Sequence, residues 1–258
     1  MVSLEAKTLM NIDLFDIDLL AKKLQRAKTH LEYDQLLYKI AAQDTVDTIV
    51  SYNKIFTNAL DLSFFPQPII NSCDKISNLT VATDIFASES LKNNVDASKY
   101  DLIISNLSIQ SINNITTYLA TIYNLLEKDG IFIGSCFGSQ TLQELLYSMM
   151  HAETSLQIAH TPNIIPLLDI QKIGNLLQKI GFKAPVVDSN IYTLEYKNIY
   201  DLCSELRKMG LTNHMHKRRK GFLSKKFWQT LNQIHQDSSS ASIGLQNSFE
   251  VLSFIAKK

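Results

Sequence analysis

Glycine is missing from the first half of the 258-residue chain, because all eight glycines lie at or after Gly130. Glycine-rich loops bind phosphate and nucleotide groups because residues without a Cβ let backbone amides approach the ligand and adopt positive φ angles. The sequence therefore excludes a glycine-rich phosphate or nucleotide loop from residues 1–129.

Cysteine is also scarce, and Cys73, Cys136 and Cys203 show no metal-binding or CxxC spacing. We interpret them as reduced thiols, which favours a cytoplasmic protein without a metal site. No apolar run reaches the ~18 residues of a membrane span, and the N-terminus lacks the pattern of a signal peptide. Lys plus Arg equals Asp plus Glu at 25 each, so we expect no overall attraction to nucleic acid or membrane.

The clearest pattern lies between Tyr100 and Gly138. Residues 101–106 (DLIISN) form a nearly all-apolar run, which is typical of a strand buried on both faces of a parallel sheet. Apolar residues at helical spacing follow from Ile112 to Leu126, and Lys128–Gly130 is expected to end that helix. A second buried strand, Ile131–Cys136, completes a right-handed βαβ unit.

Other strands and helices are predicted on both sides of this unit. The further strands are 55–62, 79–84, 184–188, 191–196 and 249–256, and the further helices are 15–38, 36–50, 141–154, 169–180, 199–209 and 224–235. Only residues 85–99 separate Asp84 from Tyr100, whereas a helix plus a strand normally needs ~25 residues. The fold class is thus α/β, with a mostly parallel sheet, helices on both faces and a shortened or missing edge strand.

The length and the 45% apolar content fit one large α/β domain. Within it we expect an N-terminal helical cover over residues 1–54 and an α/β domain over residues 55–258. A helical insertion is predicted at about 197–236 in the second part.

Several motifs resemble a known superfamily. Ser105–Leu107 after a strand, Gly134–Gly138 (GSCFG) with Thr141–Leu145 (TLQEL), and Leu206–Asn213 (LRKMGLTN) are similar to the second half of class I S-adenosylmethionine (SAM)-dependent methyltransferases. Within that superfamily, the chain resembles the complex I assembly factor that hydroxylates an arginine and the malonyl-acyl-carrier-protein O-methyltransferase of biotin synthesis. The resemblance implies a Rossmann-like fold and SAM as cofactor.

The chain departs from this superfamily where the cofactor loop should lie. Family members have a glycine-rich turn after the first strand, but here Ala59–Leu62 (ALDL) is followed by Ser63–Pro68 (SFFPQP). A positive φ at Ser63 or Phe64 would cost about 1–2 kcal/mol per residue. Proline fixes φ and lacks an amide donor, and the two phenylalanine rings are expected to occupy the cofactor's space. The sequence therefore predicts a degenerate SAM-binding loop.

The resemblance also supplies candidate site residues. On the cofactor side they are Asp61, Ser63, Asp84, Ser105 and Asn106. Asp84 stands where the family places an acceptor for the ribose hydroxyls, although an acid at the end of a strand is equally well explained as a helix cap.

On the substrate side the candidates are Met209, Gly210 and Asn213, whose turn lies over the substrate pocket in the resembling families. Many relatives carry an aromatic or His-Trp pair after the central strand, where this chain has Ile109–Ile112 (IQSI). That change removes a usual wall of the pocket.

The densest basic cluster is His214–Lys220 (HMHKRRK). His-x-His without a third ligand is a weak metal motif, so we predict no metal site. Two interpretations remain open: a solvated surface, or an anion-binding surface for an acidic acyl carrier protein or a phosphate group.

Two functions follow from these patterns. One is a SAM-dependent methyltransferase-like protein with weakened SAM binding, which acts on a protein side chain or a carrier-bound acyl group, or hydroxylates arginine as the assembly factor does. The other is a non-catalytic relative that serves as a binding protein or as an assembly protein for a respiratory complex. No set of catalytic residues stands out, because methyl transfer depends mainly on alignment of the reacting groups.

Overall fold

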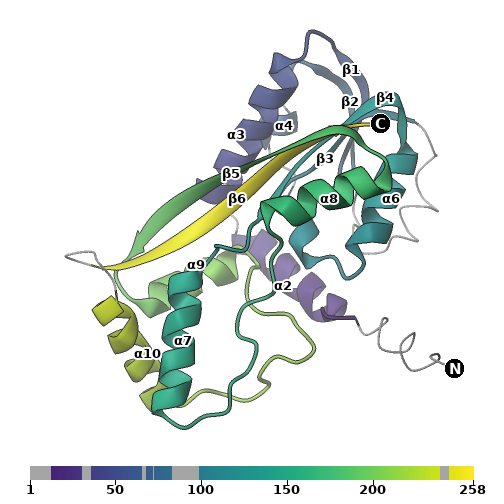
Figure 1. Ribbon diagram of the computed structural model, residues 1–258. Coiled ribbons are helices and arrows are strands. Elements are labelled where there is room, and N and C mark those ends of the chain that lie inside the picture. The colour runs from purple at the N-terminus through teal and green to yellow at the C-terminus, as the bar shows by residue number, and fades with distance from the viewer. Residues whose placement is uncertain (1–12, 31–35, 66–67, 72, 83–98, 239–243) are drawn as a thin grey trace, which may run out of the picture.

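The computed structural model describes residues 13–30, 36–65, 68–71, 73–82, 99–238 and 244–258. These residues form one six-stranded sheet in the order β2-β1-β3-β4-β6-β5 (Figure 1). Strands β1 to β4 pair in parallel, whereas β6 is antiparallel to both β4 and β5, so five strands run in one direction. The strands are β1 Phe56–Asp61, β2 Ile76–Val81, β3 Tyr100–Ser105, β4 Leu126–Phe137, β5 Lys183–Tyr196 and β6 Leu245–Lys257.

Helices cover both faces of this sheet, as predicted. In Figure 1, α3 and α4 lie on one side of the sheet and α6 and α8 on the other, while α7, α9 and α10 gather near the far end of the long β5–β6 hairpin. The helices are α2 Ile17–His30, α3 Leu36–Ser51, α4 Pro68–Asn71, η2 Ile109–Ser111, α6 Ile115–Leu125, α7 Gln143–Ser155, α8 Ile170–Ile180, α9 Ile199–Lys208 and α10 Lys225–Ser238.

Strand β3 lies at the centre of the sheet and is buried along its whole length. Because side chains of a strand alternate between faces, Ile103 packs into the larger core while Leu102 and Ile104 pack into the smaller core that α3 and α4 cover. The prediction of a central strand buried on both faces is confirmed.

The predicted end of the helix between β3 and β4 is wrong. Helix α6 ends at Leu125, and β4 begins at once with Leu126. Lys128–Gly130 lies inside β4, where the pairing with β3 shifts register, and the residue with positive φ is Asp129 at 64°. The turn signal therefore marks an irregularity in a strand instead of a helix end.

Helix α8 follows the predicted bounds closely because both of its ends are encoded locally. The Asp169 side chain caps the helix by accepting a hydrogen bond from the amide of Lys172 at 2.7 Å. Gly181 ends it with φ of 113°, a conformation that glycine adopts without a steric penalty.

The closing strands and α7 differ from prediction in detail. The two extended pieces predicted at 184–188 and 191–196 form the single strand β5, whose side chains are mostly exposed. In α7, Met149 is partly buried, whereas Met150 is 51% exposed and lies outside the core. The expected loss of an edge strand concerns residues 83–98, which lie outside the described residues.

None of the helices in the described segments has both the length and the apolar character needed to cross a membrane.

Candidate functional site

The carboxyl ends of β1 and β3 meet at one edge of the sheet, the place where open α/β sheets bind ligands. Four of the predicted cofactor residues lie together there. The Ser63 amide donates a hydrogen bond to Oδ1 of Asp61 at 2.8 Å, and the Asn106 amide donates to Oγ of Ser63 at 2.9 Å. The hydroxyl of Ser105 lies 2.8 Å from that of Ser108. These bonds join the two strand ends into one network.

Asp84, the fifth predicted cofactor residue, lies outside the described residues. The structure therefore places four of the five residues relative to one another.

Two polar atoms of this network have no hydrogen-bond partner among the described residues. They are Oδ2 of Asp61 and Nδ2 of Asn106, and both are buried. Oδ1 of Asn106, by contrast, accepts a hydrogen bond from the Thr45 hydroxyl at 2.8 Å. Burial raises the pKa of Asp61, although its hydrogen bonds from Ser63 act in the opposite direction.

Residues 62–65 follow β1, and we call them the β1 loop. Its phenylalanines are buried in the larger core, Phe64 at 6% exposure and Phe65 at 5%. The ring of Phe65 packs edge-on against Tyr38 of α3 at 5.2 Å between centroids. The Tyr38 hydroxyl in turn donates a hydrogen bond to the carbonyl of Met209 at 3.0 Å. The β1 loop is thus held from the side of the N-terminal helices.

The described part of this edge does not fit SAM as it lies. No residue of the β1 loop has a positive φ, so the strain expected at Ser63 or Phe64 does not arise. In this conformation the Ser63 amide already donates to Asp61, and the Ser63 hydroxyl oxygen already accepts from the Asn106 amide. Both groups are also buried. A cofactor needs backbone amides that it can reach, and this loop offers buried side chains instead.

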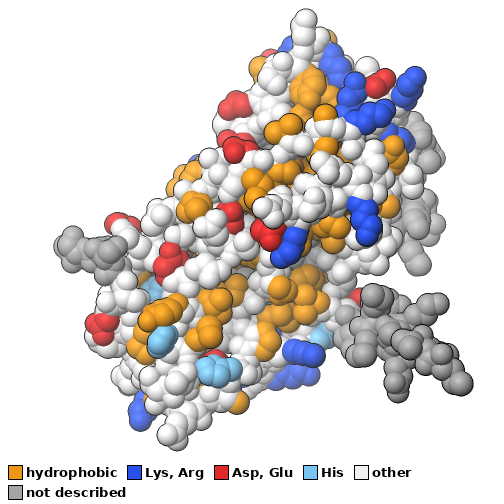
Figure 2. All heavy atoms as spheres, in the orientation of Figure 1, with side chains coloured by type: hydrophobic (Ala, Val, Ile, Leu, Met, Phe, Trp, Pro, Cys, Tyr) orange, Lys and Arg blue, Asp and Glu red, His pale blue; other side chains and the backbone are white. Residues whose placement is uncertain are grey.

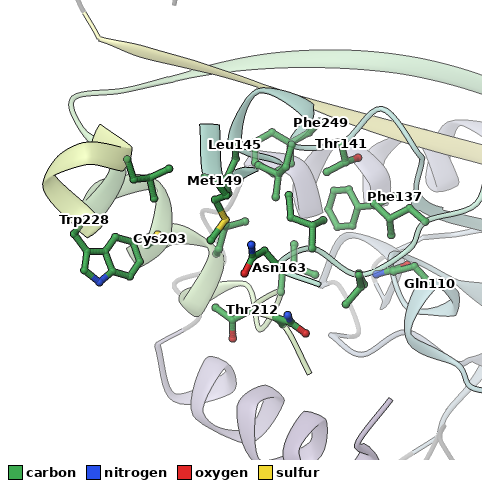
Figure 3. Close-up of a pocket in the computed structure, with 18 residues that line it drawn as sticks. Gln110, Phe137, Thr141, Leu145, Met149, Asn163, Cys203, Thr212, Trp228 and Phe249 are labelled. Atoms are coloured by element: carbon green, nitrogen blue, oxygen red, sulfur yellow. The ribbon is translucent and has the colours of Figure 1, made fainter. Parts of the chain in front are cut away.

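A separate pocket of about 150 Å³ lies beyond the end of β4. It is lined by η2, by α7, α9 and α10, and by residues 163–167 and 211–213. Figure 3 shows Gln110 and Phe137 at one end of this pocket and Cys203 and Trp228 at the other. We call it the α7–α9 pocket.

The predicted substrate-side residues are divided by the structure. Asn213 lines the α7–α9 pocket, and its side chain bridges the Pro162 carbonyl at 2.6 Å and the Met215 amide at 3.0 Å. Met209 and Gly210 do not line the pocket. Gly210 has φ of 72°, and a Cβ there would lie 2.9 Å from Cδ2 of Leu24, so this glycine allows close packing against α2.

Part of the basic cluster is used within the protein. The Arg218 guanidinium pairs with Asp16 at 3.2 Å, and the Arg219 guanidinium pairs with the buried carboxylate of Glu153 at 3.3 Å. His214 is 1% exposed and contacts the ring of Phe15, and burial lowers its pKa to about 4.

The remaining members of the cluster, His216, Lys217 and Lys220, are exposed. Within the segments that the structure describes, no group of three or more His, Cys, Asp or Glu side chains is placed to hold a metal ion. The surface of the cluster is therefore smaller and less positive than its sequence indicates.

Sequence reasoning missed two features. Glu153 accepts hydrogen bonds from Asn163 and Arg219 and lies 3.0 Å from His160, which ties α7 to both loops of the pocket. A single glutamate within a helix carries no signal for such a role. The sequence indicates Gln110 only as part of a segment that lacks the usual pocket wall, yet its side chain lines the α7–α9 pocket.

Comparison with known proteins assigns the fold. A candidate methyltransferase from Bacillus halodurans C-125 superimposes with a TM-score of 0.53 at 9% identity, over 83% of this chain and 97% of that one. The chain therefore has the Rossmann-like class I fold of that structure. A phosphoethanolamine N-methyltransferase 2 of Haemonchus contortus, solved with SAM, gives a TM-score of 0.41 at 14% identity, over 84% of this chain and 52% of that one.

Its sequence relatives include the mitochondrial arginine-hydroxylase NDUFAF5 of Mus musculus, 26% identical over 223 residues that cover 78% of this chain and 65% of the relative. They also include the malonyl-[acyl-carrier protein] O-methyltransferase of Xylella fastidiosa, 30% identical over 152 residues that cover 59% of this chain and 50% of the relative. The match thus spans less than two thirds of either relative. No family model matches the chain.

Proposed function

We propose that this protein is a SAM-dependent methyltransferase-like protein with weakened SAM binding, which acts on a protein side chain or a carrier-bound acyl group. One observation carries the proposal: Phe64 and Phe65 are buried in the β1 loop, where the resembling superfamily has a glycine-rich turn. We assign Asp61, Ser63, Asp84, Ser105 and Asn106 to what remains of the cofactor site.

We infer the acceptor of the transferred group from the names of the relatives and from the exposed basic residues near the pocket. The names of the relatives point to an arginine side chain or to malonyl groups on an acyl carrier protein. Exposed His216, Lys217 and Lys220 support an acidic carrier as partner, since they lie on the loop that also contributes Asn213 to the α7–α9 pocket. We place the protein in the cytoplasm on the basis of its reduced cysteines.

The N-terminal helices belong to the substrate side in this proposal. We assign residues 1–54 to a cover and residues 197–236 to a helical insertion, and the contacts of α2 with α9 support a cover that packs on the insertion. Nζ of Lys23 in α2 donates a hydrogen bond to the Asn213 carbonyl at 2.6 Å, which links the cover to the pocket loop.

A second candidate is a non-catalytic binding protein or a respiratory complex assembly protein. The filled cofactor edge favours it as well, because a protein that uses no cofactor has no need of an open loop. Turnover separates the two: the first function requires transfer of labelled methyl groups or hydroxylation of an acceptor at millimolar SAM, and the second predicts neither.

Calorimetric titration of the full chain with SAM tests the proposal that its affinity for SAM is weakened. We expect no saturable heat up to about 1 mM SAM, whereas a micromolar dissociation constant, about 8 kcal/mol of binding free energy, contradicts the proposal. Phe64→Gly should gain affinity because it opens the β1 loop. The matched variant Phe64→Leu should not, because it keeps an apolar side chain in the same place.

A further inference from the structure

Positive charge is concentrated in one stretch of this neutral chain. Residues 206–236 contain eight lysine and arginine residues and no aspartate or glutamate. Elsewhere the two signs are mixed, and Figure 2 shows side chains of both signs on the face of the molecule in view. Arg218 and Arg219 are paired with acids, as described above. The other six cations are exposed and have no ion-pair partner in the described segments: Arg207, Lys208, Lys217, Lys220, Lys225 and Lys226.

A fully exposed aromatic ring lies among these lysines. Phe222 has a relative exposure of 108%, and it stands between Lys220 and Lys225 in the chain. A Cβ placed on the neighbouring Gly221 would meet no atom within 4 Å, so this part of the loop extends away from the rest of the protein. An apolar ring that stays in water contributes nothing to folding through burial. The ring of Phe222 is therefore available to enter another apolar medium.

The first turn of α10 carries charges that do not stabilise the helix. Ser224 caps α10 by accepting a hydrogen bond from the amide of Phe227 at 3.1 Å. Lys225 and Lys226 follow in the first turn, which contains no acidic residue. Positive charge at a helix N-terminus opposes the helix dipole, so both lysines are unfavourable for the isolated chain. They become favourable when an anionic surface lies against this end of the helix.

Two further aromatic side chains continue this surface. Trp228 lies one turn after Lys225 and is partly exposed, and Figure 3 shows its ring at the end of the α7–α9 pocket opposite Gln110. The ring of Tyr200, which is 54% exposed, lies 6.1 Å from that of Trp228 between centroids. Tryptophan and tyrosine are enriched where lipid headgroups meet water, because each combines an apolar ring with a polar atom. The surface that we call the α10 surface consists of Tyr200, Lys220, Phe222, Lys225, Lys226 and Trp228.

We propose that the α10 surface binds an anionic lipid bilayer, with its lysines at the headgroups and Phe222 inserted below them. The full exposure of Phe222 favours a bilayer over an acidic protein or a nucleic acid. A bilayer buries an apolar ring without a preformed pocket or an unstacked base to receive it. Binding to a bilayer goes beyond the proposed function and does not require SAM.

The experiment uses Trp228, which is the only tryptophan of the chain and lies within the α10 surface. The full chain is titrated, without SAM, with vesicles of phosphatidylcholine alone and with vesicles that also contain phosphatidylserine. We expect the anionic vesicles to shift the Trp228 emission to shorter wavelength and to saturate the shift. Binding to phosphatidylcholine alone should be at least about tenfold weaker, since each lysine adds about fivefold. Salt at about 0.5 M should remove most of this preference.

Two kinds of variant separate the ring from the charges. Phe222→Ala should weaken binding to anionic vesicles about tenfold, because no ring enters the bilayer. Ile55→Ala is its control, since it shortens an apolar side chain that is 60% exposed before β1, and it should bind as wild type does. Lys225→Gln should weaken binding about fivefold. Lys128→Gln, which removes an exposed lysine from β4, should not.

The proposal is overturned if neither kind of vesicle shifts the Trp228 emission, or if Phe222→Ala binds anionic vesicles as tightly as wild type does. It is also overturned if polyglutamate or a single-stranded oligonucleotide binds more tightly than the vesicles and loses that affinity in Phe222→Ala. The occupant would then be an acidic protein or a nucleic acid. Because these titrations contain no SAM, they stand or fall independently of the weakened cofactor site.

Discussion

Two regions beyond the carboxyl ends of the strands differ in how tightly their side chains are packed. At the ends of β1 and β3, Phe64 and Phe65 are packed into the core and the polar groups bond to one another. In the α7–α9 pocket, apolar side chains leave a cavity of about 150 Å³. The comparison teaches that the described strand ends expected to hold the cofactor are packed with buried side chains, while the region expected to hold the acceptor contains a pocket.

The strongest test of this comparison is the packing of the β1 loop. Phe65→Ala should lower the free energy of unfolding by about 3–5 kcal/mol, because it removes a buried aromatic ring and leaves a cavity. Phe222→Ala is the matched control, since Phe222 is fully exposed, and it should stay within about 0.5 kcal/mol of wild type. Urea unfolding measures both. A loss below about 1 kcal/mol for Phe65→Ala would mean that the loop is not packed in the core.

Acidification should weaken the attachment of the N-terminal cover near the α7–α9 pocket. The pKa of His214 is lowered to about 4 by burial, so the unfolded chain binds a proton that the folded chain does not between about pH 6.5 and pH 4. Stability is therefore lost as the pH falls through that window, by about 2 kcal/mol between pH 7 and pH 4.5.

Urea unfolding at several pH values measures this loss. His214→Gln should remove about that much of the pH dependence, whereas His216→Gln, which changes an exposed neighbour, should retain it. Equal pH dependence in His214→Gln and wild type contradicts the assignment.

The smallest effect is expected at the filled edge itself. Because burial raises the pKa of Asp61 and leaves Oδ2 without a partner, the ionised form destabilises the folded chain at neutral pH. Asp61→Asn should therefore raise the free energy of unfolding at pH 7, because it removes the buried charge. The gain should shrink as the pH falls, since a raised folded-state pKa favours the wild-type chain in acid. Thermal unfolding at pH 7 and pH 4 checks the sign of both effects.

The local signals in the sequence predicted those elements whose ends are set by nearby residues. Helix α8 has its cap at Asp169 and its stop at Gly181, and β3 is a nearly all-apolar run. The end of α6 was missed because the turn residues after Leu126 belong to a strand irregularity that only the pairing with β3 defines. Strand β5 was split in prediction because an exposed edge strand needs no continuous apolar pattern.

The candidate site was predictable to a similar extent. A filled β1 loop follows from Ser63–Pro68 alone, since rings and prolines replace the flexible backbone. The sequence predicts that Ser63 and Asn106 lie near each other, because both follow the carboxyl ends of parallel strands. It does not predict the hydrogen bond between them. The position of Gln110 in the pocket lining depends on a hydrogen bond to Leu107 and on helices distant in the chain, so no local pattern could have shown it.

A crystal structure of the full chain, soaked in several millimolar SAM, tests the central claim most directly. The account predicts Phe64 and Phe65 packed in the core and no cofactor density at the carboxyl ends of β1 and β3. Ordered SAM at that edge, with the two rings in place or displaced, would contradict it.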